Sequence, residues 1–191
     1  FLLESANSSG VINNNSNDYI NSSISSFYNF FKSKFSLNTN KYMMFGHSAG
    51  AQFTHRYMLF SNDKRISNAV VANAGWYTFL NGADFPYGIN NSPIDITPND
   101  IRWFMSNRST LLIGGNDISL NDVNSSRGAI NQGRTRLDRA NNYFNVMIDI
   151  ADKENIPLRW TYKVVDRVGH DYKKMTFQAA KILLQDVKSF N

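Results

Sequence analysis

The sequence predicts an α/β protein, with a mostly parallel sheet flanked by helices, folded as a single domain over residues 1–191. The 191 residues, of which 42% are hydrophobic, are enough to bury one substantial core. Amphipathic segments of helical period alternate along the chain with short β-branched or aromatic runs that end at Gly, Asn or Asp. This alternation favours parallel strands joined by helical crossovers.

The first half of the chain is expected to contain two helices and two strands. Residues 19–35 have an apolar helical face formed by Ile20, Ile24, Phe27, Phe31 and Phe35. The apolar run at residues 42–45 is typical of a strand, and a helix follows it over residues 51–60. Residues 66–73 are typical of a second strand.

Two further strands and two further helices are expected in the second half, with the strands at residues 110–113 and 158–165. The helix over residues 142–155 has an apolar face made of Tyr143, Phe144, Met147, Ile148 and Ala151, and Pro157 stops it. The helix over residues 172–190 repeats the pattern with Met175, Ala179, Ile182, Leu183 and Val187.

Residues 46–50, with the sequence Gly-His-Ser-Ala-Gly, match the G-x-S-x-G nucleophile elbow. The motif lies between the first predicted strand and the helix after it, which is the context that an elbow requires. Its tight turn is expected to strain the backbone of Ser48 and to expose the hydroxyl. Gly46 and Gly50 are expected to give clearance against the neighbouring strand and helix. We therefore predict a nucleophilic serine at position 48.

A serine hydroxyl needs a base to take its proton, and the chain has three histidines. The side chain of His47 is expected to point away from the serine hydroxyl, and His55 lies two turns into the next helix, so neither is expected to reach Ser48. His170 follows the last predicted strand, at the carboxyl end of the sheet, where ligands of open α/β sheets bind. His170 is therefore the candidate general base.

The third group should be a carboxylate that orients the imidazole and ends a strand between the serine and the histidine. Asp117 meets this condition, because it follows the strand at residues 110–113 and a tight Gly-Gly-Asn turn. Asp122 and Asp166 remain alternatives, since a few residues of loop would bring either one into reach. The order Ser, Asp, His along the chain differs from that of trypsin-like and subtilisin-like enzymes.

With these residues the chain resembles the α/β-hydrolase superfamily, and within it the bacterial poly(3-hydroxybutyrate) depolymerase-like (LpqC-like) esterases. The resemblance is carried by residues 46–53, 74–77, 85–88, 132–134 and 168–171. It extends over most of residues 40–180. It implies hydrolysis of carboxylic esters through an acyl-serine intermediate.

The chain departs from that family at its beginning, where Phe1 opens an apolar triplet and an Asn/Ser-rich stretch. Members of the family have three or more earlier strands and a loop that supplies one amide of the oxyanion hole. We therefore expect an amino-terminally incomplete domain, in which the backbone N–H of Ala49 supplies the other donor. An inactive or non-catalytic binding protein of the same fold remains an alternative, as does a serine peptidase or acyltransferase.

Residues 75–109 are rich in aromatic and turn residues, and a helix around residues 99–105 is expected to start at the cap Thr97. This segment forms either a lid over the active site, with Trp76 and Tyr77 as substrate contacts, or a small core of its own. Arginines at positions 127, 134, 136 and 139 form a second cluster. Of these arginines, Arg134 is the candidate substrate contact. For the cluster as a whole, a solvated and partly salt-bridged surface is the alternative.

Composition excludes several other classes. The net charge is +5, but the basic residues are scattered among acidic ones, so no nucleic-acid partner is expected. The sequence has no run of about eighteen apolar residues, so no membrane span is predicted. No nucleotide, flavin or metal motif is present, and we expect no cofactor. The expected partner is a small or oligomeric ester, and the compartment stays open because the chain has no cysteine.

Overall fold

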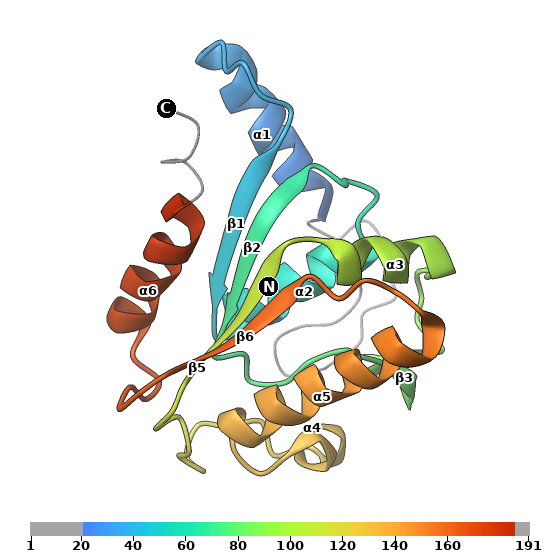
Figure 1. Cartoon of the computed structure of the whole chain (residues 1–191), viewed down its shortest axis with the longest axis vertical. Coiled ribbons are helices and arrows are strands. Elements are labelled where there is room, and N and C mark those ends of the chain that lie inside the picture. Colours follow the sequence, from blue (N-terminus) through green and yellow to red (C-terminus); the bar gives the residue numbers. More distant parts are fainter. Residues whose placement is uncertain (1–20, 186–191) are drawn as a thin grey trace.

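The computed structural model describes residues 21–185, which fold into six helices and six strands (Figure 1). The helices are α1 (Asn21–Lys34), α2 (Ala49–Phe60), α3 (Pro98–Ser106), α4 (Arg127–Gln132), α5 (Arg136–Glu154) and α6 (Tyr172–Gln185). The strands are β1 (Tyr42–His47), β2 (Ile66–Ala72), β3 (Phe79–Asp84), β4 (Gly88–Asn90), β5 (Ser109–Gly114) and β6 (Trp160–Val165).

The central sheet has the strand order β1-β2-β5-β6, and each strand is parallel to its neighbours. Parallel strands need a crossover between them, and the intervening helices supply it. Strand β1 lies at one edge of the described sheet and β6 at the other. The loops that follow β1, β2, β5 and β6 therefore all leave from one end of the sheet.

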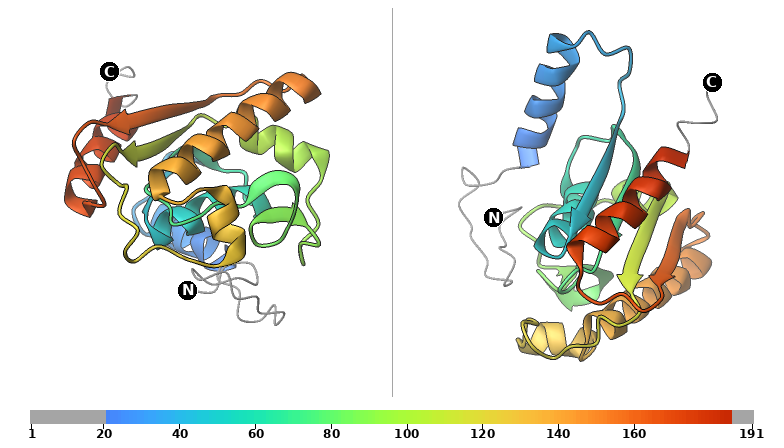
Figure 2. Two further views of the ribbon diagram at one scale, coloured as in Figure 1. Left: turned by 90° about the horizontal axis from the view of Figure 1, so that it is seen from below. Right: turned by 90° about the vertical axis from the view of Figure 1, so that its left-hand side faces the viewer.

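Helices cover both faces of this sheet (Figures 1 and 2). Alternate side chains of a strand point to opposite faces, so Ala69 and Val71 of β2 pack in one core and Val70 and Ala72 in the other. The larger core is closed by α2, α3 and α5, and the smaller by Met175 and the rest of the apolar face of α6. The predicted mostly parallel α/β architecture is confirmed.

Local hydrogen bonds explain where two helices begin. Thr97 and Asp100 form a reciprocal capping box at the start of α3, as Thr135 and Asp138 do for α5. The predicted cap at Thr97 is thus present. Helix α5 begins six residues before the predicted start at residue 142, because its first turns are polar and are set by the capping box rather than by an apolar face.

The segment at residues 75–109 contains β3, β4 and α3 (Figure 1). Its aromatic side chains Phe79, Phe85 and Phe104 are buried in the larger core, together with Tyr77. Most of the aromatic residues that suggested a lid therefore pack inside the molecule.

Helix α1 lies beside the amino-terminal end of β1, away from the carboxyl ends of the strands (Figure 1). The predicted helix is present, but within the described residues only Ile24 of its apolar face packs against the core, while Phe27, Phe31 and Phe35 are exposed by 61%, 46% and 60%. Polar contacts carry much of the attachment of α1. Residues 1–20, with the predicted start of this helix, and residues 186–191, with Val187, lie outside the described part.

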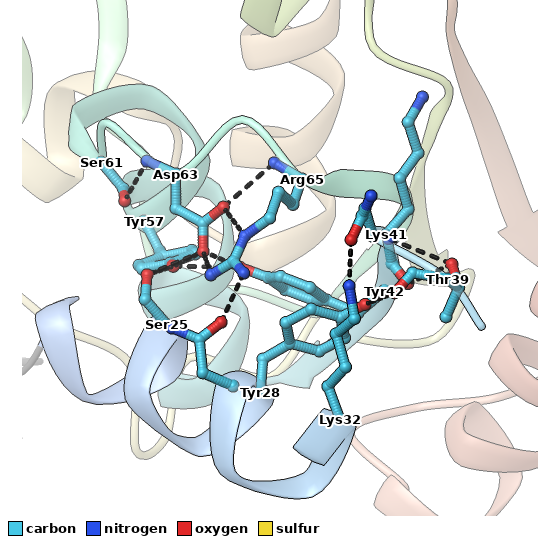
Figure 3. A network of polar contacts seen from close by, with 12 residues as sticks. Ser25, Tyr28, Lys32, Thr39, Lys41, Tyr42, Tyr57, Ser61, Asp63 and Arg65 are labelled. Carbon is cyan, nitrogen blue, oxygen red and sulfur yellow. Dashed lines mark hydrogen bonds and ion pairs between the residues drawn. The ribbon is translucent and has the colours of Figure 1, made fainter. Parts of the chain in front are cut away.

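Asp63 is the centre of the polar contacts that attach α1 (Figure 3). Its carboxylate, 5% exposed, accepts hydrogen bonds from Ser25 of α1 at 2.7 Å and from Tyr42 of β1 at 3.0 Å, and Arg65 binds it with two nitrogens. The Arg65 guanidinium also stacks on Tyr28 of α1, 4.8 Å from the ring centre. Burial alone would raise the pKa of Asp63, but the hydrogen bonds from Arg65, Ser25 and Tyr42 hold it well below its usual value.

None of the helices within residues 21–185 is long and apolar enough to cross a membrane.

The Asp63 cluster predicts an acid-sensitive stability. Because the folded-state pKa of Asp63 lies below the unfolded one, its contribution is present above about pH 4 and is lost as the pH falls further. We expect Asp63→Ala to lower the free energy of unfolding at pH 7 by about 3 kcal/mol, because it leaves buried donors unpaired. Urea unfolding at pH 7 and pH 3 measures this, with the exposed Asp149→Ala as control. Equal losses at both pH values would contradict the assignment.

Candidate active site

Ser48 is the single residue between β1 and α2, and its backbone has φ 56° and ψ −119°. A positive φ is unfavourable for a residue with a β-carbon, so Ser48 is strained in the manner expected of a nucleophile elbow. The Ser48 N–H donates to the carbonyl of Ala72 in β2, which ties the turn to the sheet. Since Ala49 opens α2, its own N–H has no acceptor within the helix.

The two glycines of the motif differ in their surroundings. A β-carbon at Gly46 would lie 2.1 Å from the carbonyl oxygen of Gly50 and 2.4 Å from the Thr54 hydroxyl, so no side chain fits. At Gly50 a β-carbon would meet none of the described residues within 4 Å. The expectation that glycine is needed for clearance is confirmed at Gly46. At Gly50 it was wrong, as far as the described residues are concerned.

The structure brings Ser48, His170 and Asp117 together in one hydrogen-bonded chain. His170 Nε2 lies 3.0 Å from Ser48 Oγ, and His170 Nδ1 lies 2.8 Å from Asp117 Oδ2. Gly114 lets the loop that carries Asp117 approach the loop that carries His170, because a β-carbon at Gly114 would lie 2.3 Å from the Val168 carbonyl oxygen. Three segments, after β1, β5 and β6, thus converge at the carboxyl end of the sheet.

The Asp117 side chain is fully buried and has donors on both oxygens. Oδ2 accepts from His170 and from Asn73 Nδ2 at 2.6 Å, and Arg136 Nη1 lies 3.4 Å from Oδ1. Burial alone would raise the pKa of Asp117, but the His170 hydrogen bond, the Arg136 charge and the Asn73 amide together hold it below its usual value. Asp117 is therefore ionised at neutral pH despite its burial.

His47 and His55, the other two histidines, have no hydrogen bond to Ser48 in the described structure. The His47 ring lies against His170, with ring centres 4.7 Å apart, and burial together with the charge of His170 lowers the pKa of His47 to about 4. His55 is fully buried, where its Nδ1 lies 2.9 Å from the Ala51 carbonyl and its Nε2 accepts from the Thr78 N–H. Burial lowers the pKa of His55 to about 3, so it stays neutral as a link within the core.

A cavity of about 380 Å³ opens beside Ser48. It is lined by Ser48, Ala49, Gln52, Gly75, Trp76, Asp122, Val123, Asn124, Ser125 and Arg136. The buried guanidinium of Arg139 braces its walls by donating to the carbonyls of Gly75 and Asn124. Most of the lining side chains are polar, which suits a compact polar substrate group better than a long alkyl chain.

The three residues suggested as substrate contacts lie in different places. Trp76 borders the cavity beside Ser48 but is itself fully buried. Tyr77 is buried in the core and stacks on Tyr143 with ring centres 4.5 Å apart. Arg134 lines a separate, smaller hollow. Of the alternative carboxylates, Asp122 lines the cavity, and Asp166 is exposed and pairs with the neighbouring Arg167.

Two residues around Asp117 were missed as parts of the site by sequence reasoning. Asn73 ends the second predicted strand, and only its position at the carboxyl end of the sheet could have indicated a role. Arg136 belongs to the arginine cluster that was expected either to contact a substrate or to form a solvated surface, but it is 6% exposed and lies against Asp117. No ordinary motif marks either residue.

The parallel sheet with helices on both faces, and the serine elbow between β1 and α2, are features of the α/β-hydrolase fold. No protein-family model matches the chain, and no curated protein matches it significantly. Among solved structures it is similar to LpqC, a poly(3-hydroxybutyrate) depolymerase from Bordetella parapertussis, with a TM-score of 0.81 and 26% sequence identity. The matched region covers 88% of this chain and 58% of LpqC.

The chain is also similar to poly(aspartic acid) hydrolase-1 from Sphingomonas sp. KT-1, with a TM-score of 0.82 and 25% identity. That match covers 92% of this chain and 69% of the other. The resemblance to depolymerase-like α/β-hydrolases, which the sequence indicated, is confirmed by these two structures. This chain spans little more than half the length of LpqC.

The contrast between the two glycines predicts opposite effects of one substitution. Gly46→Ala should lower the free energy of unfolding by about 3 kcal/mol, because the added methyl group meets backbone at the elbow. Gly50→Ala should leave stability unchanged or raise it by up to about 1 kcal/mol, since Ala favours the helix more than Gly does. Thermal and urea unfolding of the two variants measure this. A Gly46→Ala protein as stable as the wild type would refute the steric account of the elbow.

Proposed function

We propose that this chain is a serine hydrolase that cleaves carboxylic esters through an acyl-serine intermediate. Ser48 is the nucleophile, His170 the general base and acid, and Asp117 the group that orients His170. The observation that carries the proposal is the hydrogen-bonded chain from Asp117 through His170 to a serine with a strained backbone. The similarity to two hydrolases of the same fold supports it.

The two hydrogen bonds of His170 set its chemistry. An ionised Asp117 only accepts hydrogen bonds, so His170 Nδ1 carries the proton and donates it to Asp117 at 2.8 Å. The lone pair of Nε2 then faces the Ser48 hydroxyl at 3.0 Å and accepts from it. The resting site is thus ready for transfer of the serine proton.

In the acylation step Ser48 Oγ attacks the ester carbonyl carbon while its proton moves to His170 Nε2. The imidazolium that forms is stabilised by the carboxylate of Asp117. The N–H of Ala49 donates to the oxyanion of the tetrahedral intermediate. The intermediate collapses as the C–O bond to the alcohol breaks, and the alcohol leaves with the proton from Nε2.

Deacylation repeats these steps with water as the nucleophile. His170 Nε2 takes a proton from water, whose oxygen attacks the acyl carbon, and then returns the proton to Ser48 Oγ as the acid is released. Every proton is passed between Ser48, His170, water and substrate.

The polar cavity beside Ser48 supports a substrate with a short or polar acyl group, either a small ester or a unit of an oligomeric one. One similar structure is named as a poly(3-hydroxybutyrate) depolymerase, which agrees with an ester of a hydroxy acid. Trp76 is fully buried at the border of the cavity, so a substrate would contact it only after the neighbouring side chains move. Arg134 would contact only a substrate long enough to extend beyond the cavity.

Amide hydrolysis by the same three residues is the second candidate. The other similar structure is named as a poly(aspartic acid) hydrolase, and the substrate of that protein is a polyamide. A triad alone does not distinguish an ester from an amide substrate. Matched ester and anilide substrates with the same acyl group decide between the two reactions.

The first test is labelling with a fluorophosphonate, followed by peptide mapping. We expect one adduct, on Ser48, that is absent from Ser48→Ala, and hydrolysis of acetate and butyrate esters faster than of decanoate esters. A folded wild-type chain that remains unlabelled would refute the proposed nucleophile and would favour a non-catalytic protein of this fold.

Asp117→Asn tests the orienting role of the carboxylate. The amide no longer holds the proton on His170 Nδ1, so kcat should fall by about 10³- to 10⁴-fold, with KM changing far less. Asp122→Asn, on the cavity wall, is the matched control and should keep kcat within a few fold. A larger loss in Asp122→Asn than in Asp117→Asn would transfer the role to Asp122.

A further inference from the structure

We propose that Asn73 is a positioning residue, whose side-chain amide holds both Asp117 and the loop that carries His170 in the geometry needed for proton transfer. The catalytic consequence of this inference rests on the proposed function. Its structural part concerns the hydrogen bond between Asp117 and His170 and can be tested without turnover.

Asn73 directly follows β2, the strand between β1 and β5. It is fully buried, and its backbone N–H donates to the Leu112 carbonyl of β5 at 3.0 Å. Its φ of 51° lies in the left-handed region, which Asn adopts more readily than most residues with a β-carbon. Asn73 thus leaves the sheet at the same end as Ser48, Asp117 and His170, and is anchored to the central strands.

The amide nitrogen of Asn73 makes two hydrogen bonds to different loops. Nδ2 donates to Asp117 Oδ2 at 2.6 Å and to the carbonyl of Gly169 at 3.2 Å. The first acceptor is the same oxygen that His170 binds, and the second belongs to the residue directly before His170. One side chain on β2 therefore connects the loop after β5 with the loop after β6.

This arrangement restricts two motions that would separate the base from its partner. The carboxylate of Asp117 is held against rotation by Asn73 on Oδ2 and by Arg136 on Oδ1. The loop before His170 is kept close to Asp117, because the Gly169 carbonyl and the Asp117 carboxylate both accept hydrogen bonds from the same NH₂ group of Asn73. Without the amide, a buried carboxylate and a carbonyl would each lose a donor, which favours rearrangement of the pair.

The residue type matters as much as its position. An amide supplies two N–H donors without a charge, whereas an isosteric carboxylate would face Asp117 Oδ2 and the Gly169 carbonyl with a negative oxygen. Asn73→Asp and Asn73→Gly both suit a left-handed backbone, so each alters the contact with little added strain. Asn155→Gly is the matched control, because Asn155 has φ 49° at the end of α5 and makes no described contact with the site.

Kinetics with an ester substrate form the first part of the test. Asn73→Gly should lower kcat roughly 10- to 100-fold with KM nearly unchanged, the loss typical of removing an outer partner of a positioned histidine. Asn73→Asp should lower kcat at least as far, because a carboxyl group at this position either repels the Asp117 carboxylate or shares a proton with it, and both outcomes weaken the hydrogen bond between Asp117 and His170.

The second part is independent of activity. In Ser48→Ala protein, proton NMR should detect a protected, downfield Nδ1–H of His170, assigned by its loss in Asp117→Asn. Adding Asn73→Gly should broaden or abolish this signal, whereas adding Asn155→Gly should not. An unchanged signal in the Asn73→Gly background, or a kcat equal to that of the wild type, would overturn the proposal. A signal that depends on Asn73 in a protein without ester hydrolysis would sustain it and refute the proposed function alone.

Discussion

The site depends on one constraint, which is that an ionised carboxylate can be buried only where donors replace the water it has lost. Asp117 meets this with His170, Asn73 and Arg136, which come from the loop after β6, the end of β2 and the start of α5. Each of these donors also ties a different element of the fold to Asp117. The requirement to stabilise one charge thus assembles the carboxyl end of the sheet around His170.

The second requirement is that the Ser48 hydroxyl lies within reach of His170, and the strained backbone of Ser48 meets it. Ser48 keeps a positive φ because β1 and α2 are packed on either side of it and leave one residue for the turn. Gly46 allows α2 to approach β1 closely enough for this geometry, since any β-carbon there would meet the first turn of the helix. Packing in the two cores that flank the sheet therefore maintains the strained backbone of Ser48.

Sequence reasoning succeeded where a feature is local. The alternation of strands and helices along the chain follows from apolar periodicity. Ser48, His170 and Asp117, which a motif and strand ends indicated, lie within hydrogen-bonding distance of one another. Asn73 escaped notice because its two partners lie 44 and 96 positions away in the sequence, and no local pattern encodes such contacts. The exposure of Phe27 and Phe31 could not be predicted for a related reason, since periodicity indicates an apolar face but not what covers it.

The central claim is that an acyl group is carried by Ser48 and that His170 moves the protons. The most direct measurement is an acid quench of the chain during turnover of a slow ester, followed by mass spectrometry of its peptides. The account predicts one acyl group, on the peptide containing Ser48, that accumulates within one turnover and is absent from Ser48→Ala. Ester turnover that persists in Ser48→Ala, or an acyl group on another residue, would contradict it.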